Sequence, residues 1–366
     1  MSEINRNRLI RCMKAARDGK ELTIGFFGGS ITQGSLSTKP ELCYAYRVFQ
    51  WWENTFPQAK FHYVNGGIGG TSSHFGAARV EKDLLMYQPD FVVVDFSVND
   101  DEKDGLFFQE TYEGVLRRIL SWPSHPAVVV LNNVYYDTGI NAQDFHNVLA
   151  DYYGIPHVSV KDTIYQRIMK REYTREELTP DNLHPNDKGH GLVAAEICSC
   201  LEKIKEMADM TAAAAVSIEE AVIPAPVTAN AYEQAKLFNI TNSTPVLDGF
   251  RADPREKMGH LDFFKNGWTA SKVGDRITFQ LNCSCLAVQY RKTISKPSPI
   301  AKVVVDGQEA QAVILDGNFE ETWGDCLYLQ KVMHHGEAGM HTVEIEIVEA
   351  GEEDRSPFYL LSLITD

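Results

Sequence analysis

Two segments far apart in the sequence supply the residue types that a covalent hydrolase uses. Ser30 stands on paired glycines in residues 28–32, Gly-Gly-Ser-Ile-Thr, directly after an apolar run. Asp181 and His184 share the later segment Asp-Asn-Leu-His-Pro. A serine becomes a strong nucleophile when a histidine removes its proton and a carboxylate orients that histidine. These residue types therefore predict acyl transfer by a Ser30–His184–Asp181 triad.

Acyl transfer also requires hydrogen-bond donors for the oxygen that becomes an anion when the serine attacks. Residues 65–71, Asn-Gly-Gly-Ile-Gly-Gly-Thr, expose backbone N–H groups that no bulky side chain covers. Residues 97–100, Ser-Val-Asn-Asp, add a side-chain amide. We expect an oxyanion hole made of the N–H groups of Ser30 and Gly70 and the amide of Asn99.

These four segments resemble the SGNH (GDSL-like) hydrolase family, named for a Ser, Gly, Asn and His in four blocks. Gly70 is the family glycine by its spacing from Asn65, and the Asp-x-x-His block matches without change. Two blocks depart from the pattern. Gly29 replaces the Asp of Gly-Asp-Ser, a departure common among relatives that act on carbohydrate esters, and Ser97 replaces a Gly. The resemblance covers roughly residues 20–205 and implies a serine esterase that needs no cofactor and no metal.

The elements that must position these residues follow from the pattern of the first half of the chain, where apolar runs alternate with helical periodicity. The expected strands are 23–27, 61–65, 91–96, 127–131 and 155–160, and the expected helices are 44–55, 77–87, 109–120 and 187–207. Such alternation predicts a parallel sheet with both faces covered. The resemblance implies a flavodoxin-like, three-layer α/β/α domain. Ligands of such sheets bind at the carboxyl ends of the strands, where we expect all four segments.

The remaining sequence changes its pattern, which predicts a second domain. Residues 211–227 are rich in Ala, Pro and Val, and we expect them to link a catalytic domain at 1–210 to a second domain at 228–366. Polar and apolar residues alternate in 276–281, 286–290, 302–307 and 341–347. This alternation is typical of an antiparallel β-sandwich, here expected to be of jelly-roll type.

The predicted sandwich strengthens the resemblance, because SGNH esterases that deacetylate plant polysaccharides often carry one resembling a carbohydrate-binding module. The resemblance implies that Trp323 stacks on a sugar face and that Asp325 binds a sugar hydroxyl. In that arrangement a loop of the sandwich reaches over the catalytic cleft. The alternatives are that Trp323 belongs to the sandwich core and that Asp325 is an ordinary turn residue.

The composition of the chain limits which binding partners and which cellular compartment we expect. The chain has 366 residues and a formal net charge of −15, which disfavours nucleic acid because polyanion binding relies on clustered Lys and Arg. No segment has the pattern of a signal peptide or a membrane span. The seven cysteines lack zinc-site spacing and favour free thiols in a reducing compartment. We therefore expect a cytoplasmic protein whose partner is an acetylated oligosaccharide, with no nucleic acid and no membrane; the sequence leaves a homo-oligomer open.

Other interpretations of the same residues explain less. The glycines of 29–34 have the spacing of a phosphate loop, but Ser35 stands where Lys is required. Ser72 replaces the last glycine of a dinucleotide fingerprint. A metal site is a further alternative, with two candidate ligand sets: Asp181, His184 and His190, or His334 and His335.

The sequence therefore predicts a serine esterase that removes O-acetyl groups from hemicellulose-derived manno- or xylo-oligosaccharides through an acetyl-Ser30 intermediate. Two other functions stay open at this point. One is an SGNH lipase, thioesterase or aryl-esterase that acts on non-carbohydrate esters. The other is a carbohydrate-binding protein whose hydrolase domain is inert.

Overall fold

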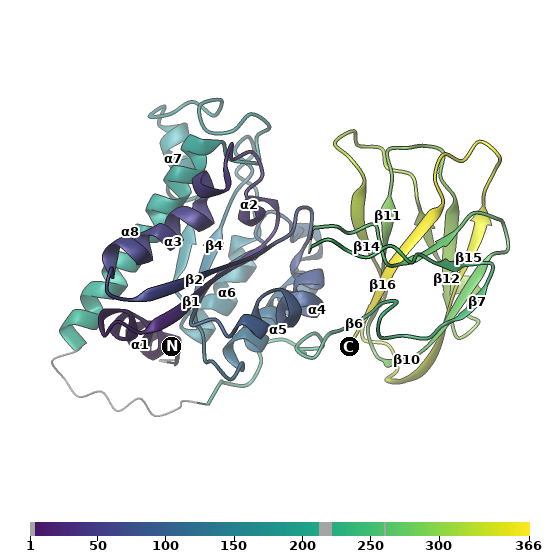
Figure 1. Ribbon diagram of the computed structural model, residues 1–366, viewed down its shortest axis with the longest axis horizontal. Helices are drawn as coiled ribbons and strands as arrows, with labels where there is room; N and C mark the ends of the chain where they lie inside the picture. Colours follow the sequence, from purple (N-terminus) through teal and green to yellow (C-terminus); the bar gives the residue numbers. More distant parts are fainter. Residues whose placement is uncertain (1–3, 212–221, 260) are drawn as a thin grey trace. The chain divides into compact units, whose positions relative to one another are not determined.

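The computed structural model describes residues 4–211, 222–259 and 261–366, and the chain divides into two compact units (Figure 1). The first unit ends at Glu233 and the second begins at Gln234. Part of the expected linker, residues 212–221, lies outside the described residues. Among the residues that are described, no helix combines the length and the apolar composition needed to cross a membrane.

A five-stranded parallel sheet forms the centre of the first unit. Its strands are rich in β-branched and aromatic residues, which suit a pleated surface buried on both faces. They are β1 (Glu21–Gly28), β2 (Lys60–Gly67), β3 (Phe91–Asp95), β4 (Ala127–Asn132) and β5 (His157–Ser159). The strand order is β2-β1-β3-β4-β5, which is the flavodoxin-like order. The expected fold class of this region is confirmed.

Helices cover both faces of the sheet (Figure 1). They are α1 (Ile4–Arg17), α2 (Ser30–Gln33), α3 (Tyr44–Thr55), α4 (Ser73–Asp83), α5 (Gly105–Leu120), α6 (Gln143–Tyr153), α7 (Ile164–Met169) and α8 (Asp187–Thr211), with short 3-10 turns η1 (Pro40–Leu42), η2 (Leu85–Tyr87) and η3 (Glu102–Asp104). Helices α1 and α3 both pack against α8 on one face, and Trp52 of α3 is buried in the core there. Helices α4, α5 and α6 pack on the other face.

The sequence pattern located α3, α5 and α8 but did not predict α1. Two residues on the buried side of α1 are polar, which obscures its helical periodicity. Asn5 is buried and exchanges two hydrogen bonds with the backbone of Val128 on β4, at 2.9 and 2.7 Å. Arg8 is also buried and donates to the carbonyl of Leu120 at 2.7 Å. The helix is thus held by hydrogen bonds to distant backbone that a sequence pattern cannot reveal.

Two antiparallel sheets form the second unit, and they confirm the predicted β-sandwich. One sheet has the order β13-β12-β15-β10-β7 and the other β14-β11-β16-β9-β8, with β6 paired to β16. The strands are β6 (Lys236–Phe238), β7 (Val246–Asp248), β8 (Arg251–Ala252), β9 (Trp268–Ala270), β10 (Arg276–Cys283), β11 (Leu286–Lys292), β12 (Ile300–Val305), β13 (Val313–Asp316), β14 (Cys326–Met333), β15 (Gly339–Glu349) and β16 (Phe358–Thr365), with a 3-10 turn η4 (Glu309–Gln311). Alternate residues of β10 and β15 are buried, as expected for strands with one face on a core.

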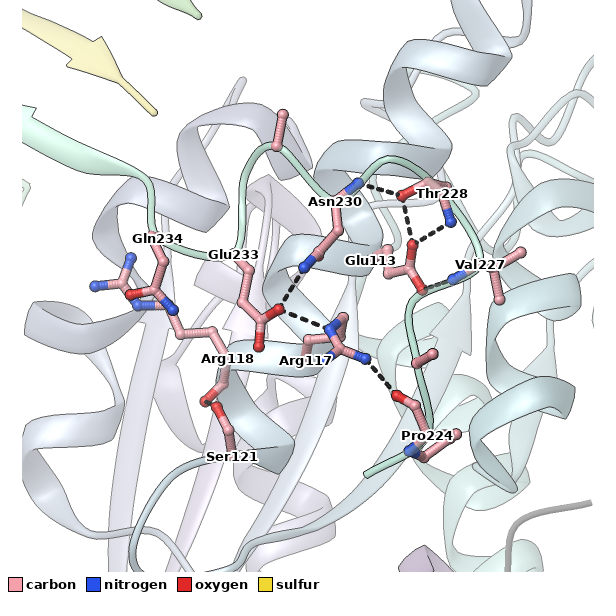
Figure 2. Close-up of polar contacts among 12 residues, drawn as sticks. Glu113, Arg117, Arg118, Ser121, Pro224, Val227, Thr228, Asn230, Glu233 and Gln234 are labelled. Carbon is pink, nitrogen blue, oxygen red and sulfur yellow. Dashed lines mark hydrogen bonds and ion pairs between the residues drawn. The ribbon is translucent and has the colours of Figure 1, made fainter. Parts of the chain in front are cut away.

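The connecting segment, residues 222–233, lies along the first unit and is held by buried charged groups of α5 (Figure 2). The carboxylate of Glu113 is fully buried and accepts hydrogen bonds from the N–H groups of Val227 and Thr228, at 2.7 and 2.8 Å. The hydroxyl groups of Thr228 and Tyr153 also donate to it. Four donors on one carboxylate compensate the cost of burying its charge.

Arg117, one turn further along α5, fixes both ends of the connecting segment (Figure 2). Its guanidinium donates to the carbonyl of Pro224 at 2.7 Å and pairs with the carboxylate of Glu233 at 2.7 Å. Because these contacts reach Glu233, the chain divides at that residue and not at residue 228. The stretch 228–233 lies with the first unit for this reason.

Candidate active site

Ser30 lies at the carboxyl edge of the sheet, directly beyond β1. Gly28 ends this strand and pairs with Gly67 of β2 on one side and with Asp95 of β3 on the other. The chain then turns at Gly29 and enters the short helix α2, whose first residue is Ser30. Ser30 is 7% exposed. The turn thus presents the hydroxyl where the strand order reverses, which is the usual ligand site of such sheets.

A continuous chain of hydrogen bonds joins Ser30, His184 and Asp181. The Oγ of Ser30 is 2.7 Å from Nε2 of His184, and Nδ1 of His184 is 2.6 Å from Oδ2 of Asp181. A carboxylate can only accept, so Nδ1 carries the hydrogen and Nε2 is free to accept the hydroxyl proton. The structure therefore brings together the three residues that the sequence suggested for the triad, in an order that suits proton transfer from the serine.

The loop that carries Asp181 also keeps its carboxylate charged. Asn182 adopts a left-handed backbone conformation, with φ of 70°. Oδ1 of Asp181 accepts from the N–H groups of Leu183 and His184, at 3.0 and 2.7 Å. Partial burial acts to raise the pKa of the Asp181 carboxyl, but the hydrogen bonds from the ring and N–H of His184 and from Leu183 outweigh it and hold that pKa below its ordinary value.

The three donors expected for the oxyanion have no acceptor among the described residues: the N–H of Ser30, the N–H of Gly70 and the side-chain amide of Asn99. Gly70 has φ of 68°, a left-handed conformation that favours glycine. A Cβ built on the neighbouring Gly69 would lie 3.6 Å from Cβ of Ser30, so this loop passes beside the serine.

His190 belongs to a different environment from the triad, although the metal alternative groups it with Asp181 and His184. Its Nδ1 accepts from the N–H of Tyr44 at 3.2 Å, and its Nε2 donates to the carbonyl of Ser35 at 3.1 Å. Burial lowers the pKa of His190 to about 4, so the ring is neutral at pH 7. Both ring nitrogens are occupied by backbone groups, which leaves none to bind a metal ion.

Comparison with known proteins agrees with this geometry. Residues 26–192 match the model of the GDSL-like lipase/acylhydrolase family. Two solved structures of a two-domain esterase active on acetylated mannans are similar to the whole chain. One has 48% identity and a TM-score of 0.93; the other, co-crystallized with mannopentaose, has 47% identity and a TM-score of 0.92. Each comparison covers 98% of this chain and 94% of the solved one.

The chain belongs to the GDSL-like lipase/acylhydrolase family. It is therefore a carboxylic ester hydrolase. A search among curated proteins found no match.

The departures of this chain from the usual family blocks have visible reasons. A Cβ added at Gly29 would lie 2.2 Å from Oδ1 of Asn99, so the Asp of the usual Gly-Asp-Ser block would require this amide to move. Ser97 is buried where the family has Gly, and its hydroxyl lies 3.0 Å from a carboxylate oxygen of Asp95 and 3.2 Å from the carbonyl of Asn133. The extra hydroxyl therefore has polar partners.

Sequence reasoning overlooked Arg79, a buried charged residue on α4 that lies beside the family blocks. Its guanidinium donates to the carbonyls of Gly28 and Gly66, at 2.9 and 2.5 Å. Burial lowers the pKa of Arg79 to about 10, against the opposing effect of Asp83 at 3.1 Å, so the group remains charged at pH 7. The available signal was its place in a helix with a carboxylate four residues later.

Asp100, next to Asn99, is a second buried polar residue. It belongs to a family block, but the block pattern does not indicate its role. Its Oδ1 accepts from the N–H of Ser73, the first residue of α4, at 2.8 Å. Its Oδ2 lies 2.9 Å from Nε2 of His146 on α6. The ring of Tyr112 stacks on His146, with centroids 3.6 Å apart. Asp100 thus joins the segment that carries Asn99 to the helix that follows Gly70.

The second unit contains the remaining two predicted residues. Trp323 is 64% exposed and packs edge-on against Phe319, with ring centroids 5.0 Å apart, so it does not belong to the sandwich core. Oδ1 of Asp325 accepts from the hydroxyl of Thr293 at 2.7 Å and from the N–H of Ile294 at 3.2 Å. Its Oδ2 lies 3.8 Å from the guanidinium of Arg291. Asp325 thus organises a turn while one of its oxygens retains accepting capacity.

Proposed function

We propose that this protein is a serine esterase that removes O-acetyl groups from manno-oligosaccharides derived from hemicellulose. The observation that carries the proposal is the hydrogen-bonded chain from Ser30 through His184 to Asp181, at 2.7 and 2.6 Å. The substrate class is supported by the similarity, over both units, to a two-domain esterase active on acetylated mannans. Acetylated xylo-oligosaccharides are the second substrate class to be tested.

In the proposed reaction, Oγ of Ser30 attacks the acetyl carbonyl while Nε2 of His184 takes the hydroxyl proton. Asp181 stabilises the imidazolium that forms. When the tetrahedral intermediate collapses, the C–O bond to the sugar breaks and His184 returns the proton to the departing sugar oxygen. Water then attacks acetyl-Ser30 with the same base and releases acetate. Every proton is accounted for by the three side chains and water, so the reaction needs no cofactor.

The three free donors would stabilise both tetrahedral intermediates of this reaction. The N–H groups of Ser30 and Gly70 and the amide of Asn99 have no acceptor among the described residues, so no existing bond has to break when the oxyanion forms. Preorganised donors of this kind commonly provide the largest single share of the rate acceleration. We assign the oxyanion hole to these three groups.

For the second unit, we assign Trp323 and Asp325 to sugar binding. The exposed indole face of Trp323 offers the apolar platform on which a pyranose ring stacks, and its contact with Phe319 limits its motion. A sugar hydroxyl would donate to Oδ2 of Asp325, because Oδ1 is already occupied by Thr293 and Ile294.

The proposal includes the subcellular location of the enzyme. All seven cysteines are free, and several are buried, which suits a reducing compartment. We therefore assign the enzyme to the cytoplasm and its substrates to imported oligosaccharides. Fractionation of the native host, followed by detection with an antibody, tests this; recovery outside the cytoplasm would contradict it.

Mass spectrometry of acetylated manno- and xylo-oligosaccharides, before and after incubation with the enzyme, tests the proposed function. We expect stepwise loss of acetyl groups with wild type and none with Ser30→Ala. Ser124→Ala is the matched control, because that serine only donates to the carbonyl of Pro89, before β3. Equal deacetylation by wild type and Ser30→Ala would refute the triad. Hydrolysis limited to lipid, thioester or aryl substrates would favour the other family activities, and no hydrolysis at all would favour an inert binding protein.

A further inference from the structure

We infer that Arg79 is a positioning residue for the proposed acyl transfer: its guanidinium ties the strand end that carries Ser30 to the loop that carries Gly70. The inference rests on the proposed function. Arg79 is 2% exposed and lies on α4, the helix that follows this loop. It touches neither member of the acid–base pair, so its action on the reaction would be indirect.

The contacts of Arg79 converge on the two segments that form the donor side of the site. Nη2 donates to the carbonyl of Gly28 at 2.9 Å, two residues before Ser30. Nη1 donates to the carbonyl of Gly66 at 2.5 Å, where β2 ends, and Nη2 lies 3.3 Å from Oγ1 of Thr71. Gly66 and Thr71 stand on either side of Gly70 in the sequence. One side chain therefore spans both segments.

Only a guanidinium makes this set of contacts. Its N–H groups form a rigid planar fork, whereas the ammonium of a lysine is a single point. The plane of Arg79 also lies over the ring of Phe27, 4.3 Å from its centroid, which fixes the orientation of the fork. Asp83 balances the charge, with a carboxylate oxygen 3.1 Å from Nη1 of Arg79.

The energetics argue that Arg79 does more than attach α4 to the sheet. Burying a guanidinium is costly, and an apolar side chain would pack a helix at least as well. The Nε–H of Arg79 is buried with no acceptor among the described residues, which adds to the cost. What the arginine supplies, and a leucine could not, is a fixed spacing between the carbonyls of Gly28 and Gly66.

That spacing sets the distance between the attacking oxygen and a donor for the oxyanion. Donors stabilise a transition state only when they lie within a few tenths of an ångström of the required position. Loss of the hydrogen bonds from Arg79 to the two carbonyls should therefore displace the N–H of Gly70 relative to Ser30. Because Arg79 is buried and would not itself bind the substrate, we expect the loss in kcat, with little change in KM.

The test compares Arg79→Lys and Arg79→Met with wild type on 4-nitrophenyl acetate and on acetylated manno-oligosaccharides. Arg79→Lys keeps the charge and the pairing with Asp83 but cannot bridge both carbonyls. We expect kcat to fall about tenfold in Arg79→Lys and roughly 10²-fold in Arg79→Met, with KM within threefold of wild type. A kcat of Arg79→Lys within threefold of wild type on both substrates would overturn the inference.

Arg117→Met is the matched control, because it also removes a part-buried arginine with several hydrogen bonds, here to the connecting segment. We expect it to lower the unfolding midpoint and to leave kcat on 4-nitrophenyl acetate unchanged. An equal loss of kcat in Arg117→Met and Arg79→Lys would mean that lost stability alone explains both, and the inference would be wrong.

A double-mutant cycle with Asn99→Ala asks whether Arg79 acts through the oxyanion hole. If both residues serve the same hole, the combined loss in kcat should be smaller than the product of the two single losses. Multiplicative losses would contradict the inference. Ser30→Ala in the same assays separates the two proposals: activity in Ser30→Ala refutes the proposed function, whereas loss there with full activity in Arg79→Lys refutes only the role of Arg79.

Discussion

Each of the two units contains a hydrogen-bonded aspartate–histidine pair, with the same distance between the ring nitrogen Nδ1 and the carboxylate. In the first unit, Nδ1 of His184 is 2.6 Å from Asp181; in the second, Nδ1 of His341 is 2.6 Å from Asp306. The difference lies at the other ring nitrogen. For His184 it faces the hydroxyl of Ser30 at 2.7 Å, and for His341 it faces the backbone carbonyl of Glu337 at 2.8 Å.

These partners decide what each ring can do. A hydroxyl can donate, so His184 can be neutral and serve as a base. A carbonyl only accepts, so His341 is best satisfied when both nitrogens carry hydrogens. The hydrogen bond to Asp306, together with the Glu337 carbonyl, accordingly raises the pKa of His341 above its ordinary value. Of the two pairs, only the one whose free ring nitrogen faces a proton donor, here the Ser30 hydroxyl, is arranged to act as a base.

Replacing each histidine in turn gives the strongest test of the difference between His184 and His341. We expect His184→Ala to lower kcat on 4-nitrophenyl acetate by about 10⁴-fold or more, because the serine loses its base. His341→Ala should leave kcat within twofold of wild type. Steady-state kinetics on both variants check this, and comparable losses would mean that the two pairs do not differ as described.

The second largest effect is expected from the oxyanion donors proposed for the first unit. We expect Asn99→Ala to lower kcat by roughly 10²–10³-fold with little effect on KM, since one oxyanion donor is lost. Asn99→Asp should be at least as impaired, because a carboxylate of the same shape cannot donate and repels the oxyanion. Activity of Asn99→Asp at the wild-type level would remove Asn99 from the hole.

A variant that tests the proposed sugar binding by the second unit should show a smaller effect. Trp323→Ala removes an exposed aromatic platform, so we expect KM for acetylated manno-oligosaccharides to rise roughly two- to tenfold. Turnover of 4-nitrophenyl acetate should not change, because that substrate has no sugar. Tyr87→Ala, another exposed aromatic, is the control. An unchanged KM in Trp323→Ala would separate this residue from the substrate.

The pH dependence of stability should show the smallest effect. The raised pKa of His341 means that the folded protein holds this proton more tightly, so the stabilisation is complete below its ordinary value of 6.5 and is lost as the pH rises through the raised pKa. The pKa of Asp306 is lowered, chiefly by the hydrogen bond from His341, so its stabilisation is lost as the pH falls below 3.8 and through the lowered pKa.

Thermal unfolding of wild type and His341→Gln between pH 5 and 8 would measure this dependence. We expect the advantage of wild type to shrink as the pH rises. A constant difference across the range would show that the ring does not carry a proton in the folded sandwich.

Much of the fold and of the candidate site follows from local sequence. The buried strands are uninterrupted apolar runs, and the Asp-x-x-His spacing is itself short-range, since Asp181 accepts both the ring and the N–H of His184. Knowledge that parallel strands end at one edge then suffices to bring Ser30 toward this loop.

What the sequence did not reveal depends on polar contacts between distant segments. Arg79 was assigned only to a helical stretch, because nothing local marks the carbonyls of Gly28 and Gly66 as its acceptors. The unit boundary likewise depends on Glu113 and Arg117 reaching the connecting segment. Buried charged residues that bind backbone groups leave no periodicity to detect.

The close approach of Gly29 to Asn99 limits which residues can replace Gly29. The backbone at Gly29, with φ of −87°, would accept any residue, so the obstacle to the family's usual aspartate is purely spatial: Oδ1 of Asn99 lies 2.2 Å from where a Cβ would stand. A single substitution to Gly-Asp-Ser would therefore displace the very amide assigned to the oxyanion. An Asp at position 29 of this chain therefore requires the Asn99 side chain to take a new position.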